Sequence, residues 1–406
     1  MGRAETTPAN HADRISCEPP RAGQPRNGAG GVMIHANVER ESDFAPETRT
    51  LALRLAAHPF PTQLVPVKAQ RAHLLNFRPS ATSRDLQRLT HDHLDLADSV
   101  LYQSGSPSHW NLDFYGRCRV GRAAFGTDRI PDGWAERCNA LDEIWVPSEF
   151  HRETFAASGV ERNKIHVIPC ALDTQIFCPD RSPLRLPSVP ARSFQFLAIA
   201  DGMLASGIDT LVRAFVEEFA PDDDVALMLH CPPKRCGDCY IDFEAEVIAL
   251  IETELGKDLE DIPTIALVMG SLSDEDRAGM FAAAHAFVHP ARADATGRSC
   301  LEAFACRVPV IATDWGPLHH FLTNQNSFPL ATCGMVAARP DEDELFAGRR
   351  WAEPDLDHLR NRMREVFNHP NEAVRRAAQG RLEVGEKFDW NVVLPEWIRN
   401  FQRLLD

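Results

Sequence analysis

The chain has 406 residues, a formal net charge of −15 at pH 7, 44% hydrophobic residues and 25% charged residues. This length allows two or three domains, and the composition is ordinary for a soluble globular protein. The acidic balance disfavours nucleic acid or an anionic membrane surface as the main partner. No apolar run approaches the roughly 18 residues of a membrane span, and no signal peptide is recognisable, so we expect a cytoplasmic protein.

The first half of the chain alternates short apolar runs with helical patterns. Residues 1–31 are rich in Pro, Gly, Ala and Arg without periodicity, which predicts a disordered tail. A strand–helix–strand unit is expected from residue 32 to residue 67. Ser148 is a favourable N-cap with Glu149 in the first turn, which predicts a helix directly after it. Further short strands are predicted at 99–102, 118–125, 141–146 and 165–168.

A linker rich in Pro and Ser follows at 180–190, and the alternation then starts again. Ser273 and Asp276 form a capping-box pattern that predicts a helix from 274 to 284. Strands alternating with helices on both sides of a linker predict two doubly wound α/β domains that face a central cleft. We assign residues 32–180 and 181–387 to these domains and 388–406, with an apolar residue at every fourth position, to a terminal helix.

Val288–Thr313 concentrates the chemistry of the second domain. A strand ends near residue 288, a polar loop with Gly297 follows, and 298–306 is predicted as a helix before a strand at 308–312. Such a helix N-terminus at the carboxyl end of a strand binds anions through its backbone N–H groups. Asp294 and Glu302 flank this position. The same pattern is also compatible with a strand–loop–helix that carries two solvated acids.

The eleven cysteines form no recognisable disulfide framework. One cluster, HCPPKRCGDC, contains His230, Cys231, Cys236 and Cys239. Its Cys-x-x-Cys spacing with a third Cys and a His is compatible with a zinc site, and equally with a loop that carries incidental thiols. Both interpretations remain open from the sequence.

Several segments resemble family-4 retaining glycosyltransferases, which have the GT-B fold of two Rossmann-like domains. The two long segments are LDEIWVPSEFHRETFAASGVERNKIHVIPCALDTQIFCP (141–179) and AAAHAFVHPARADATGRSCLEAFACRVPVIATDWGP (282–317). RVGRAAFGTDRIPDGW (119–134) is similar to the segment before them. The closing FDWNVVLPEW resembles the family's terminal helix, which crosses back onto the first domain.

The resemblance implies a nucleotide-sugar donor (UDP- or GDP-linked), an unidentified acceptor, transfer with retention by front-face attack, and no metal or other cofactor. The family's pair of Glu residues falls on Asp294 and Glu302, which implies catalytic roles: Asp294 on the donor sugar and Glu302 on the ribose. The remaining donor-binding positions implied by the family are Gly270, Ser271 and Leu272 at the base, and Gly297, Arg298, Ser299 and Cys300 at the sugar and diphosphate.

The chain departs from the family pattern at four places. Ala205 and Ser206 replace the Arg and Lys that neutralise the diphosphate, and Arg298 or Arg292 are the candidate substitutes. Asp294 replaces a Glu, Gly126 replaces the acid of the Phe-Glu-Thr-Asp core, and Ser42-Asp43-Phe44 replaces a glycine-rich turn. Loss of cations beside a leaving group reduces its electrostatic stabilisation.

These departures keep two alternatives open beside an active glycosyltransferase. One is a weakened or inactive relative that acts as a nucleotide-sugar-binding or scaffold protein. The other is a different GT-B enzyme, such as a sugar-nucleotide epimerase or a phosphorylase. If the missing cations limit the chain, restoring them with Ala205→Arg and Ser206→Lys should increase both diphosphate affinity and turnover.

Overall fold

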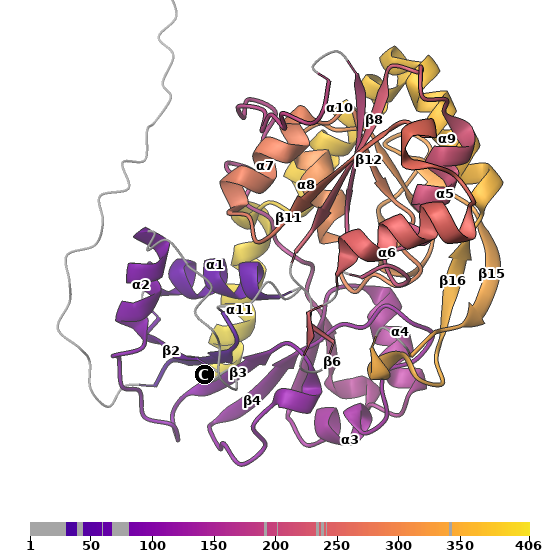
Figure 1. Ribbon diagram of the computed structural model, residues 1–406. Helices are drawn as coiled ribbons and strands as arrows, with labels where there is room; N and C mark the ends of the chain where they lie inside the picture. The colour runs from indigo at the N-terminus through magenta and orange to yellow at the C-terminus, as the bar shows by residue number, and fades with distance from the viewer. Residues whose placement is uncertain are drawn as a thin grey trace, which may run out of the picture.

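The computed structural model contains two parallel six-stranded sheets, one in each half of the chain, with helices packed on both (Figure 1). The predicted α/β fold with two doubly wound domains is therefore confirmed. The predicted tail, apart from its last residues, and Ser42-Asp43 lie outside the residues that the structure describes. Those residues are 30–38, 44–58, 60–66, 81–190, 193–200, 202–232, 235–236, 239–240, 242–340 and 343–406.

The N-terminal sheet has the strand order β2-β1-β3-β4-β5-β6, and all its pairs are parallel. Strands β1, β3 and β5 are nearly continuous runs of buried residues, as expected for strands covered on both faces, whereas β2, β4 and β6 are partly exposed. The strands are β1 (Val32–Ala36), β2 (Thr62–Pro66), β3 (Val100–Ser104), β4 (Cys118–Arg122), β5 (Glu143–Val146) and β6 (Ile165–Val167). The helices are α1 (Ala45–Ala56), α2 (Ala81–Leu89), α3 (Trp134–Asn139) and α4 (Glu149–Ala157).

The C-terminal sheet has the order β11-β8-β7-β12-β13-β14, which places β7 and β12 at its centre. Its strands are β7 (Phe194–Ile199), β8 (Val225–Cys231), β11 (Thr264–Met269), β12 (Ala286–His289), β13 (Val310–Thr313) and β14 (Phe328–Leu330). The helices are α5 (Ile208–Glu218), α6 (Phe243–Ala249), α7 (Asp274–Ala283), α8 (Arg298–Ala305), α9 (Leu356–Asn368) and α10 (Pro370–Lys387). The short strands β9 (Arg235–Cys236) and β10 (Cys239–Tyr240) form a separate hairpin.

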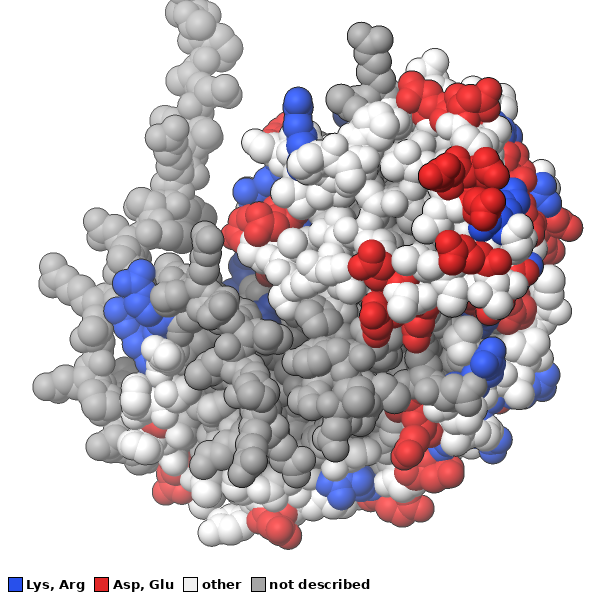
Figure 2. Space-filling model, viewed as in Figure 1, with Lys and Arg blue, Asp and Glu red and all other residues white. Residues whose placement is uncertain are grey.

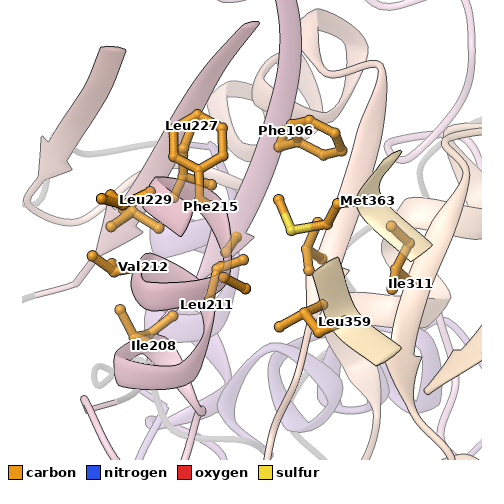
Figure 3. Packing of buried hydrophobic residues seen from close by; sticks show 14 of the residues in the cluster. Phe196, Ile208, Leu211, Val212, Phe215, Leu227, Leu229, Ile311, Leu359 and Met363 are labelled. Atoms are coloured by element: carbon orange, nitrogen blue, oxygen red, sulfur yellow. The ribbon is translucent and has the colours of Figure 1, made fainter. Parts of the chain in front are cut away.

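One hydrophobic core of this domain lies between the sheet and the helices α5 and α9 (Figure 3). Phe215 of α5 lies beside Leu227 of β8, and Leu211 of α5 and Leu359 and Met363 of α9 belong to the same cluster. All five side chains are fully buried. Burial of apolar area on this scale holds α5 firmly against the sheet, so the turn that precedes α5 has a fixed position.

An antiparallel hairpin that the sequence did not predict connects the two domains. It consists of β15 (Thr332–Ala337) and β16 (Arg350–Pro354). The segment 343–350, which includes the start of β16, reaches the first domain. There Arg350 exchanges hydrogen bonds with Asp128, and Arg349 pairs with Asp132 at 2.8 Å.

The last helix, α11 (Trp390–Leu405), packs on the N-terminal sheet. Its Trp397 and Phe401 contact Tyr102 of β3 and Trp145 of β5 with ring centroids 4.9 to 5.8 Å apart. The chain passes between the domains twice, once near Leu172 and once near Asp389, and an isolated β-bridge pairs these two residues. The domains are thus connected at this crossing and again, on separate elements, at the hairpin.

Two predicted helix caps have different outcomes. Ser273 caps α7 as predicted, because its hydroxyl accepts the Asp276 N–H and also pairs with the Asp276 carboxylate. Ser148 occupies the N-cap of α4, but its hydroxyl bonds His151 Nδ1 at 2.8 Å instead of a backbone N–H.

Two surface properties bear on partners. None of the helices formed by the described residues combines the length and the apolar character that crossing a bilayer requires. Acidic side chains lie over the C-terminal domain around α5, α6 and α9 (Figure 2), in keeping with the net negative charge.

Candidate active site

The start of α8 is held by a turn that only glycine fits. Gly297 caps the helix in the left-handed region with φ 69°, and a Cβ there would lie 2.6 Å from the Phe321 ring. The turn follows β12, at the carboxyl end of a central strand. In an open α/β sheet ligands bind at this end, and the first N–H groups of a helix have no acceptor within the helix.

Asp294 is bound within its own loop. One carboxylate oxygen accepts the N–H groups of Thr296 and Gly297 at 2.7 and 2.6 Å, and the other lies 2.6 Å from His289 Nε2. Burial raises the pKa of Asp294, but His289 and the two N–H groups outweigh that effect and hold the pKa below its ordinary value. The carboxylate is therefore anionic, and its contacts fix the shape of the loop at the position predicted for the sugar.

Glu302 is enclosed by two arginines. Its side chain is 1% exposed, with one oxygen 2.6 Å from Arg277 Nε and the other 2.8 Å from Arg298 Nε. Arg277 also donates to the Ser299 hydroxyl at 2.9 Å. Two guanidinium groups therefore share one carboxylate beside the first turn of α8. Sequence reasoning did not identify Arg277, because it lies on α7, 25 residues before its partner.

The Gly270–Leu272 segment leads directly into α7. His230 at the end of β8 bonds the Gly270 carbonyl at 3.0 Å through Nε2, while its buried Nδ1 has no partner among the described residues. Burial, together with the charge of Arg277, lowers the pKa of His230 to about 4. The structure thus brings the predicted base position next to Arg277, and through it to Glu302.

The turn with Ala205 and Ser206 is packed against the neighbouring loop. The Ala205 carbonyl accepts the N–H groups of Arg292 and Ala293, and the Ala205 side chain, 6% exposed, packs with Trp351. A longer side chain at 205 would have to displace this contact. The predicted benefit of Ala205→Arg therefore conflicts with the packing.

Of the two candidate substitutes for the missing cations, only Arg298 lies at the α8 N-terminus. Arg292 is held at 2.7 Å by both Asp209 and Glu353, and it also donates to the Leu204 carbonyl. Two carboxylates more than neutralise this guanidinium, so Arg292 has a structural role.

The first domain approaches the α8 loop through two residues. A Cβ on Gly126 would lie 2.4 Å from the Asp294 carbonyl oxygen, so with the domains in this position the family's Glu does not fit. His151 of α4 is fully buried, and its Nε2 has no hydrogen-bond partner among the described residues. Burial and the charge of Arg122 lower the pKa of His151, and the Ala295 backbone and Asp294 raise it. The net result is a pKa of about 3.

The zinc interpretation gains no support from the described residues. Cys231 packs in the core with α5 and α6, whereas His230 is on the other face of β8 and bonds Gly270. Neighbouring positions of a strand point to opposite faces, so these two side chains do not converge. Within the described part of the chain, no group of three or more His, Cys, Asp or Glu side chains is placed to hold a metal.

Comparison with known proteins gives the following similarities. Residues 261–366 match the family model "Glycosyl transferases group 1". Over 249 residues the chain is 25% identical to the MMP alpha-(1->4)-mannosyltransferase of Mycolicibacterium hassiacum, a match that covers 61% of this chain and 50% of that protein. The chain thus matches only about half the length of this curated relative.

Solved structures share the whole fold at low sequence identity. A glycosyltransferase from Rickettsia africae has a TM-score of 0.65 and 14% identity, with 93% of this chain and 99% of that chain covered. Anabaena HepE, in complex with UDP and glucose, has a TM-score of 0.64 and 12% identity, with 92% and 99% covered. Sucrose-phosphate synthase from Thermosynechococcus elongatus has a TM-score of 0.64 and 15% identity, with 93% of this chain and 99% of that chain covered. The chain therefore has the GT-B fold, with a glycosyl transferases group 1 segment that contains the candidate site.

Proposed function

We propose that the protein is a retaining glycosyltransferase of family 4 that transfers a sugar from a UDP- or GDP-linked donor to a hydroxyl-bearing acceptor. The observation that carries the proposal is the position of Glu302 between Arg277 and Arg298 at the α8 N-terminus. This arrangement combines a carboxylate for ribose hydroxyls with cations and helix N–H groups for a diphosphate.

Each part of a nucleotide sugar has a matching group. We assign the base to Gly270–Leu272 and the ribose hydroxyls to Glu302, whose 1% exposed side chain the ligand reaches by displacing part of the cover that Arg277 and Arg298 provide. The diphosphate is held by Arg298 and by the N–H groups that open α8. Charge develops on the leaving diphosphate as the bond to the sugar breaks, so these donors stabilise the transition state more than the bound substrate.

Asp294 is placed for the transferred sugar. Its carboxylate is anionic, and His289 and two backbone N–H groups hold it in position. The sugar hydroxyls donate to its remaining lone pairs. With the leaving diphosphate taking the acceptor proton, no further base is required, and no metal is assigned a role.

The comparisons support a nucleotide-sugar donor. The matched curated relative is a mannosyltransferase, and the structure of HepE contains UDP and glucose. The matched family segment, 261–366, contains Arg277, Asp294, Arg298 and Glu302 together with the Gly270–Leu272 segment. Titration with each nucleotide distinguishes between a UDP-linked and a GDP-linked donor.

The test is calorimetric titration of UDP and GDP, followed by transfer and hydrolysis assays with UDP- and GDP-sugars. Glu302→Gln should weaken nucleotide binding ten-fold or more, because charge-assisted hydrogen bonds contribute roughly 1.5–3 kcal/mol each. Glu386→Gln, at an exposed position of α10, is the matched control and should leave affinity unchanged. Unchanged affinity in Glu302→Gln would remove the ribose role.

A second candidate function is favoured by the turn before α5. Ala205 and Ser206 stand where the family pattern has an Arg and a Lys, so these two positions supply no cation for the diphosphate. A weakened or inactive relative would bind nucleotide through α8 yet transfer no sugar. Nucleotide binding of ordinary affinity without turnover on any donor would favour this scaffold role over catalysis.

A further inference from the structure

A pocket of about 480 Å³ lies between the two domains, beside the candidate site. This open pocket is lined by α4 of the first domain and by the short helix Gly316–His320, which follows β13 of the second. Its volume lies within the range of small-molecule sites. Because each domain supplies one wall, the pocket exists only while the domains are together.

Aromatic rings form one part of its lining. Phe150 and Trp315, one from each domain, meet edge to face with their ring centroids 5.3 Å apart. Each ring is partly exposed, so an apolar surface faces the cavity. Such surfaces fit the C–H faces of a sugar ring, which carries its hydroxyl groups around the edge.

The polar lining is acidic. The carboxylates of Glu149, Glu153 and Asp314 line the pocket together with His319 and His320, and no Lys or Arg is among the lining residues. Each of these carboxylates has a partner: Arg152 pairs with Glu149, Arg162 with Glu153, and His319 Nδ1 lies 2.7 Å from Asp314. The remaining lone pairs of the carboxylates accept hydrogen bonds from hydroxyl groups, whereas a phosphate meets no Lys or Arg among the lining residues.

The pocket adjoins the proposed transfer centre through consecutive residues of α4. Phe150 lines the pocket, while the next residue, His151, is buried near the Asp294–Ala295 loop with its Nε2 unpartnered among the described residues. In the second domain, β13 is the direct neighbour of β12, whose end carries Asp294. A ligand in the pocket would therefore lie next to a sugar held at Asp294.

We propose that this pocket binds the acceptor, and that the acceptor is a neutral, unphosphorylated sugar. The inference rests on the proposed function and specifies the acceptor class of the same site. The aromatic pair holds the sugar ring, and Glu149, Glu153 and Asp314 accept its hydroxyls.

The first experiment is saturation-transfer NMR and calorimetry on the full chain with neutral sugars and a phosphorylated one. The probes are glucose, mannose, maltose and sucrose against glucose 6-phosphate, with UDP or GDP present. At least one neutral sugar should bind, glucose 6-phosphate should bind at least ten-fold more weakly, and Trp315→Ala should weaken the neutral sugar ten-fold or more. Tyr115→Ala, which removes an exposed aromatic outside the pocket, is the control and should change nothing.

A second variant keeps the test independent of folding. Glu153→Lys introduces a cation at an exposed position of the rim and should shift the preference toward glucose 6-phosphate. Tighter binding of the phosphorylated sugar by the wild type, unchanged binding in Trp315→Ala, or no binding of any neutral probe would overturn the proposal. If nucleotide binds but neutral sugars do not, only this inference fails. If neutral sugars bind and no nucleotide does, the proposed transferase function fails and the pocket assignment stands.

Discussion

Two turns of the C-terminal domain share one backbone design and differ in their surroundings. Gly207 before α5 and Gly297 before α8 both cap a helix in the left-handed region, with φ of 68° and 69°. Both follow a central strand, and a Cβ at either would clash, with the Pro290 carbonyl at 1.9 Å or with the Phe321 ring at 2.6 Å. By local geometry alone, each qualifies as an anion site.

The difference lies in which charges surround each turn. The guanidinium nearest the α5 turn, Arg292, is bound by Asp209 and Glu353, and Ala205 faces Trp351. At the α8 turn, Arg277 and Arg298 share the single carboxylate of Glu302. The same strand–glycine–helix geometry therefore places one arginine between two carboxylates at the α5 turn and two arginines around one carboxylate at the α8 turn, where we propose that the diphosphate binds.

The largest expected effect is on the α5 turn. Arg292→Met leaves Asp209 and Glu353 without their shared partner and should lower the free energy of unfolding by about 3 kcal/mol, because breaking a mostly buried ion pair strands its charges. Urea denaturation followed by circular dichroism measures this change. Arg298→Met is the matched variant and should cost clearly less stability; equal losses would contradict the distinction between the turns.

The candidate site should also respond to acid through His230, which bonds the Gly270 carbonyl and senses the charge of Arg277. The pKa of His230 in the folded protein is about 4, against an ordinary value of 6.5. The unfolded chain therefore binds the proton first, so the stability contributed by the neutral imidazole is complete above pH 6.5 and is lost as the pH falls toward 4. The loss reaches roughly 3 kcal/mol at the lower end.

Denaturation curves at several pH values check this dependence. His230→Asn removes the titrating group, and its stability should fall less steeply than that of the wild type between pH 6.5 and 4. Parallel pH profiles for the two proteins would show that His230 is protonated equally in the folded and unfolded states.

Ala205→Arg with Ser206→Lys tests whether the α5 turn can be converted into a copy of the α8 site. We expect a loss of about 1–3 kcal/mol, since a large side chain is forced into the contact with Trp351, and no gain in nucleotide affinity. Thermal unfolding and calorimetry give the two quantities. A gain in affinity at unchanged stability would mean that the turn accommodates the cations, as the family pattern suggested.

The smallest expected effect is on affinity at the α8 turn. Arg298→Met should weaken UDP or GDP binding about ten-fold, equivalent to roughly 1.4 kcal/mol, because Arg277 and the helix N–H groups remain. Arg292→Met, assayed at a temperature where it is folded, should bind nucleotide normally. The reverse order of affinities would assign the diphosphate to the α5 turn.

Local pattern by itself predicted the architecture and the backbone of the candidate site. Buried strands alternating with amphipathic helices are visible as apolar periodicity, and the cap of α7 by Ser273 depends on residues three positions apart. Gly297 at the start of α8 was predicted in the same way, because a helix N-cap after a buried strand has a local sequence signature. These features depend on residues that are close together in the chain, so they can be predicted from the sequence.

Only the tertiary structure determined which charged side chains pair with one another. Arg292 meets Asp209 from 83 residues away and Glu353 from 61 residues away, and Glu302 meets Arg277 across 25 residues. The hairpin β15–β16 delivers Trp351 against Ala205 and Arg349 against Asp132 of the other domain. Whether an arginine can bind a ligand depends on how many carboxylates the folded chain places beside it. A local sequence pattern does not contain that information.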